Sequence, residues 1–264
     1  MADPLDLTGK SALVTGGTRG VGRGIAERLL EAGAQVVVCG RKQPEALPTG
    51  GGRTASFVSA DVRDVEQAQT LVDETVKRQG SLDILVNNAG GAPFADAATA
   101  SPRFSEAILR LNLIAPLNLA QQANRFMQQQ DGGGSIINIG SVSAVRPSPG
   151  TAAYGAAKAG LLSLTQSLAV EWAPRVRVNI ITAGPILTEQ AELHFGDEAG
   201  VARVAATIPA GRLGEPRDVG DLCLFLASPL SAYMSGASLL LHGGGEKPAF
   251  LDAAADDTGG KDAK

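Results

Sequence analysis

Seven short apolar runs alternate with longer segments of helical periodicity, and no other feature of the sequence constrains the fold as strongly. The runs occupy residues 11–15, 35–39, 55–59, 84–87, 135–139, 177–181 and 238–241. The helical segments occupy residues 20–32, 64–79, 102–129, 151–172 and 216–227. Because parallel strands need long crossover connections, the alternation predicts an α/β doubly wound Rossmann fold, with a seven-stranded parallel sheet and helices on both faces.

The 264 residues are predicted to form a single domain, since 44% are hydrophobic, 19% are charged and no central segment resembles a linker. We place that domain at residues 1–245. Residues 246–264 lose the apolar pattern and are predicted to be a polar, mobile C-terminal tail. The stretch 41–53 is rich in Pro and Gly and is predicted to be a loop with little helix.

Charge and composition argue against several classes of partner. A net charge of -4 and a pI near 5.3, without a cluster of Lys or Arg, give no attraction to nucleic acid. No apolar run approaches the ~20 residues of a membrane helix, and the first residues lack a secretory signal, so we expect a cytoplasmic protein without membrane contact. The distant cysteines Cys39 and Cys223 are typical of buried hydrophobes in a reducing compartment. With two histidines far apart, no metal site is predicted.

A glycine-rich turn lies between the first predicted strand and the first predicted helix. It reads Thr15-Gly16-Gly17-Thr18-Arg19-Gly20-Val21-Gly22. Free backbone N–H groups at a helix N-terminus favour a pyrophosphate, and a Cβ at the glycines would block its approach. The turn is therefore predicted to bind a dinucleotide. Its predicted contacts are Gly16, Thr18, Arg19, Gly20, Val21 and Gly22.

The spacing Thr-Gly-x-x-x-Gly-x-Gly resembles the short-chain dehydrogenase/reductase family, whose other motifs follow in order over residues 7–245. Within that family the chain is most similar to the 3-oxoacyl-thioester reductase-like members. The resemblance implies that Asp61 and Val62 hold the adenine and that Asn88, Ala89 and Gly90 shape the floor under the adenosine. It also implies cofactor contacts at Gly184, Ile186 and Thr188, a lid at about 188–209, and an active-site tetrad of Asn112, Ser141, Tyr154 and Lys158.

The end of the second strand reads Cys39-Gly40-Arg41-Lys42, without the carboxylate that binds the ribose hydroxyls of NAD. Arg41 and Arg19 flank the place where a 2′-phosphate would lie, and a guanidinium is well suited to phosphate. NADP-preferring members of the resembling family carry Arg at these positions. The sequence therefore predicts that NADP(H) is favoured over NAD(H).

Tyr154 and Lys158 are four residues apart on a predicted helix, so their side chains share one face. A free phenol titrates near pH 10, and a nearby ammonium, together with a positive nicotinamide, is expected to lower that pKa. Ser141 follows the fifth strand and can stabilise charge on a substrate oxygen. In the resembling family, Asn112 bends its helix and holds a water that connects Lys158 to solvent.

These residues predict an oxidoreductase that transfers a hydride between NADP(H) and a ketone or secondary alcohol. Tyr154 is the expected general acid/base, assisted by Lys158 and Ser141, and both Tyr154 and Lys158 are also expected to contact the cofactor. Two alternatives stay open: a non-catalytic NADP(H)-binding sensor or regulatory protein, and another reaction such as epimerisation or dehydration. Enoyl reductases of related fold space Tyr and Lys further apart. The substrate itself is not predicted.

Three further features of the sequence concern the loop around Gly184, the two histidines and the long helical segments. Where the family has Pro before Gly184, this chain has Ala183, so the sequence does not predict the shape of that loop. His242 stands where the family commonly has Asp and is interpreted as a structural replacement, whereas His194 is interpreted as a solvated or lid residue. The segments 102–129 and 151–172 are rich in small and apolar residues, which favours a homo-oligomer, a dimer or a tetramer as is usual among relatives.

Overall fold

Seven strands form one parallel sheet in the computed structural model, which describes residues 3–189, 191 and 195–251. The strands are β1 (Ser11–Thr15), β2 (Gln35–Gly40), β5 (Ser56–Ser59), β6 (Ile84–Asn87), β7 (Gly134–Ile139), β8 (Val176–Ala183) and β9 (Ser238–Leu241). Their order is β5-β2-β1-β6-β7-β8-β9. The predicted seven-stranded doubly wound fold is therefore confirmed. The strand order reverses between β1 and β6, and ligands of such sheets bind at the carboxyl ends beside that point.

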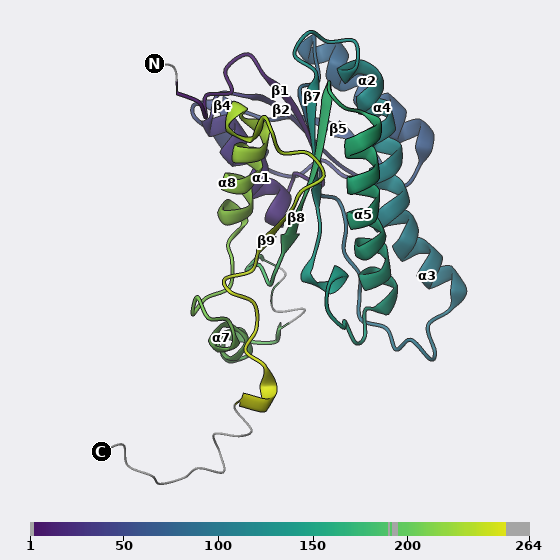
Figure 1. Cartoon of the computed structure of the whole chain (residues 1–264), viewed down its shortest axis with the longest axis vertical. Coiled ribbons are helices and arrows are strands. Elements are labelled where there is room, and N and C mark those ends of the chain that lie inside the picture. Colours follow the sequence, from purple (N-terminus) through teal and green to yellow (C-terminus); the bar gives the residue numbers. More distant parts are fainter. Residues whose placement is uncertain (1–2, 190, 192–194, 252–264) are drawn as a thin grey trace.

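Helices cover both faces of the sheet, as predicted (Figure 1). On one face α1 (Gly20–Glu31) packs against α8 (Pro216–Ala227). On the other lie α2 (Val65–Gln79), α4 (Ala115–Met127) and α5 (Ala152–Glu171). Each layer has its own apolar core with the buried side chains of the central strands, because a parallel sheet between two helical layers is apolar on both faces.

The helix predicted over 102–129 is interrupted in the structure. It consists of α3 (Pro102–Leu109), a π-helical turn η1 (Arg110–Ile114) and α4. The N–H of Ala115 bonds the carbonyl of Arg110, five residues back. Pro116 has no N–H, so it cannot donate to the carbonyl of Asn112 as an α-helix requires. The missing donor explains why regular helix does not continue through this point.

Two regions contain more structure than the sequence predicted. Inside the predicted loop 41–53, β3 (Thr49–Gly50) and β4 (Arg53–Thr54) form a small antiparallel hairpin, whose turn is made by Gly51 and Gly52 at φ 56° and 73°. Inside the expected lid, α7 (Glu198–Thr207) begins at the N-cap Asp197, whose side chain accepts a hydrogen bond from the N–H of Gly200. Short 3-10 turns also occur at Val142–Ala144 (η2) and Pro229–Ser231 (η3).

The first residues of the predicted tail contact the domain. Glu246 forms an ion pair with Arg146 at 2.7 Å, and the N–H of Lys247 donates to the carbonyl of Thr207 at 3.1 Å. The remainder of the tail, 252–264, lies outside the described residues, as does His194. Within the described part of the chain, no helix is long and apolar enough to cross a membrane.

Candidate active site

The glycine-rich turn follows β1 and leads into α1 at the switch point of the sheet. Gly16 and Gly20 have φ values of 62° and 52°, which side chains with a Cβ rarely adopt. A Cβ on Gly22 would lie 2.4 Å from both the Asn88 Nδ2 and the Gly16 carbonyl oxygen. Arg19, the N-cap residue, makes no capping bond with its side chain, so the first turn of α1 presents its N–H groups. This arrangement fits a dinucleotide pyrophosphate.

Segments from three strand ends meet at this turn. The Oγ1 of Thr15 accepts hydrogen bonds from the N–H groups of Asn88 and Ala89, each at 3.0 Å. The Asn88 Nδ2 donates to the Thr15 carbonyl at 2.9 Å. Gly20 faces Thr188, whose Cγ2 would lie 3.6 Å from a Cβ on that glycine. The residues predicted around the cofactor after β1, β6 and β8 are thus brought together.

The end of β2 lies beside the same turn. A Cβ on Gly40 would be 3.5 Å from the Oγ1 of Thr18. Arg19 directly follows Thr18 and Arg41 directly follows Gly40, so the two arginines lie on neighbouring segments. Both arginines are exposed, and neither guanidinium donates a hydrogen bond to any residue that the structure describes. Two free guanidinium groups at this corner provide donors for an anion.

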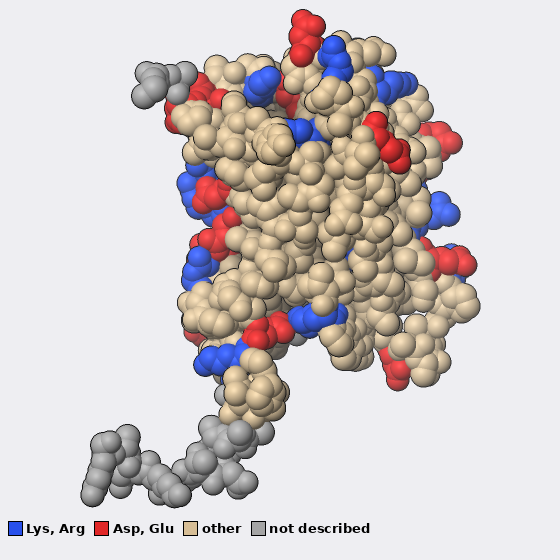
Figure 2. All heavy atoms as spheres, in the orientation of Figure 1, with Lys and Arg blue, Asp and Glu red and all other residues tan. Residues whose placement is uncertain are grey.

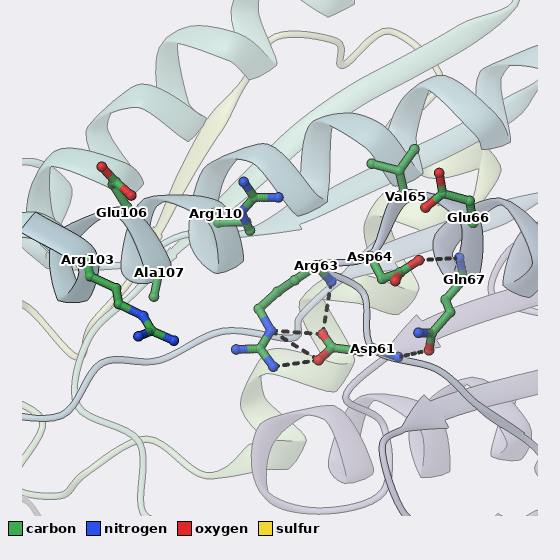
Figure 3. Close-up of a pocket in the computed structure, with 10 residues that line it drawn as sticks. All are labelled: Asp61, Arg63, Asp64, Val65, Glu66, Gln67, Arg103, Glu106, Ala107 and Arg110. Carbon is green, nitrogen blue, oxygen red and sulfur yellow. Dashed lines mark hydrogen bonds and ion pairs between the residues drawn. The ribbon is translucent and has the colours of Figure 1, made fainter.

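Asp61, predicted at the adenine, is held by a neighbouring cation. Arg63 donates to its carboxylate through Nε at 2.9 Å and also through its backbone N–H at 3.0 Å. The hydrogen bond from the Arg63 side chain is the main cause that lowers the pKa of Asp61. Both residues line an open hollow of about 520 Å³ between α2 and α3 (Figure 3). Arg103 extends into it from α3. Buried Val62 follows Asp61 and is not among its lining residues.

Ser141, Tyr154 and Lys158 lie together beyond the carboxyl end of β7. The phenol of Tyr154 is hydrogen-bonded to the Ser141 side chain. Lys158 is 3% exposed, and its Nζ lies 5.6 Å from the centre of the Tyr154 ring. The Nζ donates to the carbonyl oxygen of Ile139 at 2.7 Å. The cluster therefore joins a half-buried phenol, a half-buried hydroxyl and a buried ammonium.

Asn112 lies near Lys158, beside the segment that follows β6. Its Oδ1 accepts from the N–H of Gly91 at 2.9 Å, and its Nδ2 donates to the Gly91 carbonyl at 3.0 Å and the Ile108 carbonyl at 2.9 Å. A Cβ on Gly90 would lie 2.7 Å from the Asn112 Oδ1 and 3.4 Å from the Lys158 Nζ. The π-helical turn thus carries Asn112 against the segment that follows β6.

Burial sets the acidity of both titratable groups. It lowers the pKa of Lys158 to about 8, because the charged form loses its hydration. It also raises the pKa of Tyr154, and the hydrogen bond with Ser141 offsets this only in part. The groups of the chain therefore do not lower the pKa of the phenol by themselves, and the lowered pKa is expected from Lys158 together with a positive nicotinamide.

The loop after β8 is held without the proline of the family pattern. The N–H of Leu187 donates to the Gly214 carbonyl at 2.7 Å, the N–H of Gly214 donates to the Pro185 carbonyl at 3.0 Å, and Ile186 forms a bridge with Gly214. A Cβ on Gly184 would lie 2.8 Å from the Cβ of His242. His242 thus packs against this loop.

Three groups of the site were not found from the sequence. The carbonyl of Ile139 and the backbone of Gly91 act through main-chain atoms, which leave no side-chain signal. Pro116 did leave one, because a proline four residues after Asn112 inside a helical pattern predicts a break in the hydrogen bonding at that residue.

The strand order, the switch point and the glycine turn define a protein of the Rossmann-fold class. Comparison with known proteins narrows the class. The family model described as enoyl-(acyl carrier protein) reductase matches residues 16–246. L-rhamnose 1-dehydrogenase (NAD(P)(+)) of Azotobacter vinelandii is 37% identical, over 90% of this chain and 97% of that protein. The 3-oxoacyl-[acyl-carrier-protein] reductase FabG of Haemophilus influenzae is 37% identical, over 90% and 98%.

Solved structures agree with these relatives. A short-chain type dehydrogenase/reductase from Mycobacterium marinum superimposes with a TM-score of 0.85 at 34% identity, over 93% of this chain and 99% of that one. RhlG of Pseudomonas aeruginosa, solved as an NADP active-site complex, has a TM-score of 0.85 at 31% identity, over 92% and 99%. The chain belongs to the short-chain dehydrogenase/reductase family and is an oxidoreductase of that family.

Proposed function

We propose that this oxidoreductase is an NADP(H)-dependent carbonyl reductase or alcohol dehydrogenase with Tyr154 as the general acid/base. The observation that carries the proposal is the contact of the half-buried Tyr154 phenol with Ser141, with the Nζ of Lys158 5.6 Å from the centre of the same ring. A proton donor, a hydrogen-bonding hydroxyl and a cation are the groups that reduction of a carbonyl requires at the oxygen atom.

The cofactor site in this proposal extends across the carboxyl edge of the sheet. The turn 15–22 takes the pyrophosphate, residues 88–90 lie under the adenosine, and Ile186 and Thr188 contact the nicotinamide end. Asp61 and Val62 bind the adenine, so the carboxylate of Asp61 is shared between its ligand and Arg63. When bound, the cofactor supplies or accepts the hydride and, in its oxidised form, brings a positive charge.

Proton transfer is assigned to Tyr154. During reduction the phenol donates its proton to the substrate oxygen, and during oxidation the phenolate removes the proton from the alcohol. Ser141 donates a hydrogen bond to the same oxygen and stabilises its negative charge. Lys158, which is protonated below pH of about 8, favours the phenolate, whose pKa burial alone would raise. Asn112 keeps the path from Lys158 to solvent in place through its bonds to Gly91.

NADP(H) is favoured in the proposal because of Arg19 and Arg41. Both guanidinium groups are exposed beside the contact between Thr18 and Gly40, where the 2′-phosphate of NADP would lie. Arg41→Ala is expected to lower kcat/KM with NADPH about 10- to 100-fold and to leave kcat/KM with NADH nearly unchanged. Preference of the unmodified protein for NADH would contradict the assignment.

The central experiment is NADPH oxidation against a panel of ketones, 3-oxoacyl thioesters and quinones, with Tyr154→Phe measured in parallel. Turnover of a carbonyl compound that falls at least about 100-fold in Tyr154→Phe supports the proposal. Full activity of that variant, or the absence of turnover with every carbonyl, would overturn it. NADPH binding without turnover would favour the alternative of a sensor or regulatory protein.

We also propose a homo-oligomer. Figure 2 shows a face over α5 and β9 whose centre has few charged side chains. Val170 of α5 is 81% exposed and Leu240 of β9 is 57% exposed, and a second copy of the chain would cover such apolar side chains. Light scattering is expected to report a dimer or a tetramer, and Val170→Glu is expected to shift the distribution towards smaller species. A monomer at micromolar concentration would refute the proposal.

A further inference from the structure

A second cavity lies directly beside Tyr154. It has a volume of about 80 Å³ and is bounded by the loop 92–100, the beginning of α3 and the first turn of α5. Tyr154 forms part of its wall, so the cavity adjoins the residue proposed as the general acid/base.

Most of the residues that line this cavity are apolar. Six alanines of the loop and of α5, with Phe104 and Ile108 of α3, supply much of the wall, and none of its lining residues is charged. Among its few hydroxyls, that of Thr151 is already paired with the Ser148 hydroxyl at 2.6 Å. A polar substituent placed here would lose hydration with few groups to replace it.

Two contacts hold together the loops that form this cavity, and they maintain its size. The N–H of Ala95 donates to the carbonyl of Gly150 at 2.8 Å. The ring of Phe94 lies over Gly150 so closely that a Cβ on this glycine would be 1.9 Å from the ring. Gly150 has a φ of 75°, so the close approach and the backbone conformation both require glycine.

The volume limits the substituent to a few carbon atoms. A dry protein cavity of about 150 Å³ accepts a benzene ring, so about 80 Å³ corresponds to roughly three carbons. Larger groups would extend beyond the walls of the cavity, and smaller ones would leave apolar surface without contacts.

We infer that the substrate is a ketone or secondary alcohol that carries a compact, uncharged alkyl substituent of about three carbons, which occupies this cavity. The inference rests on the proposed function of Tyr154 and assigns the substrate class that function leaves undefined. Polyhydroxylated or charged groups belong on the opposite side of the carbonyl carbon. Ala97 and Phe104 then contribute to specificity, because both line the cavity.

The test uses phenyl ketones whose second substituent grows from methyl to hexyl. The phenyl ring exceeds the cavity, so the alkyl group is the part that enters it. The kcat/KM with NADPH is expected to be highest near propyl and to fall about ten-fold or more at hexyl. A terminal hydroxyl on the propyl group is expected to lower kcat/KM by up to about 100-fold.

Three variants make the test specific. Ala97→Leu fills the cavity and is expected to move the optimum to methyl, with at least about a ten-fold loss for propyl. Phe104→Ala widens it and is expected to move the cutoff towards longer chains. Ala98→Leu is the matched control, because Ala98 lies in the same loop but not on the cavity wall, and its length profile is expected to equal that of the unmodified protein.

The outcomes separate this inference from the proposed function. Turnover that depends on Tyr154 but not on alkyl length, or a length profile that Ala97→Leu leaves unchanged, overturns the inference and leaves the function standing. Turnover that does not depend on Tyr154, or no turnover at all, overturns the function and the inference together.

Discussion

The two halves of the site are built in different ways. On the cofactor side, the turn after β1 and the segment after β6 approach so closely that a Cβ on Gly22 would lie 2.4 Å from the Asn88 side chain. On the substrate side, the loops 92–100 and 142–150 are joined by one backbone hydrogen bond and the ring of Phe94. The first half allows one backbone path and several fixed glycines, whereas the second requires glycine at Gly150 and has fewer close contacts elsewhere.

The comparison predicts its largest effect at Gly22. Gly22→Ala is expected to destabilise the protein by about 3 kcal/mol and to abolish NADPH binding, since its Cβ would meet both the Asn88 Nδ2 and the Gly16 carbonyl. Chemical denaturation and NADPH titration measure the two effects. Gly132→Ala is the matched control, because its Cβ would find only the Lys10 Nζ at 3.6 Å. Equal stability and binding in the two variants would show that the cofactor half is not constrained by close packing.

A second prediction concerns Lys158, which lies between the two halves. Its folded-state pKa of about 8 is below the ordinary 10.5, so the unfolded chain binds more protons than the folded chain between these values. The free energy of unfolding therefore rises by about 2 to 3 kcal/mol through this group as pH rises from 7 to 10. Lys158→Met should lack this gain, whereas exposed Lys77→Met should retain it.

Denaturation of the three proteins at several pH values measures the difference between their slopes. The range stops at pH 10 because the raised pKa of Tyr154 acts with the opposite sign above it. Identical slopes for Lys158→Met and the unmodified protein would mean that Lys158 is well hydrated in the folded chain.

A third prediction concerns the π-helical turn, which connects the helical layer to Asn112 of the site. Pro116→Ala restores an N–H that can bond the carbonyl of Asn112 and compete with the π-helical turn. Displacement of Asn112 from Gly91 is expected to lower kcat about ten-fold, with KM and stability nearly unchanged. Pro102→Ala, at the start of α3, is the control. A kcat equal to that of the control would show that the turn does not depend on Pro116.

The same contrast explains what the sequence revealed about the fold. The central strands lie between two helical layers and must be apolar on both faces, and the less buried edge strands β5 and β9 also contain consecutive apolar residues, so all seven were visible as apolar runs. Helix α7 was not predicted, because Gly200 is its only buried residue and it therefore has no apolar stripe. The hairpin β3–β4 consists of largely exposed residues, and the π-helical turn inserts too little chain to disturb a 28-residue apolar pattern.

The sequence also revealed more of the cofactor side of the site than of the substrate side. The glycines, Asn88 and the residues around Lys158 belong to motifs with fixed spacing, and the structure brings them together at one edge of the sheet. The cavity beside Tyr154 has no such spacing, since any small apolar residues at 97 and 153 would line it. The burial that raises the pKa of Tyr154 was also hidden, because it depends on segments remote in sequence.

The smallest effect is expected on the substrate side, at the ion pair of Arg146 and Glu246. The two side chains are 41% and 36% exposed, and exposed pairs contribute about 0 to 1 kcal/mol because water screens them. In a double-mutant cycle of Arg146→Ala and Glu246→Ala, the coupling energy is expected to stay below about 1 kcal/mol and to shrink as salt is added. Because this pair ties the loop 142–150 to the segment after β9, a coupling above about 2 kcal/mol would show a substrate side as rigidly built as the glycine turn.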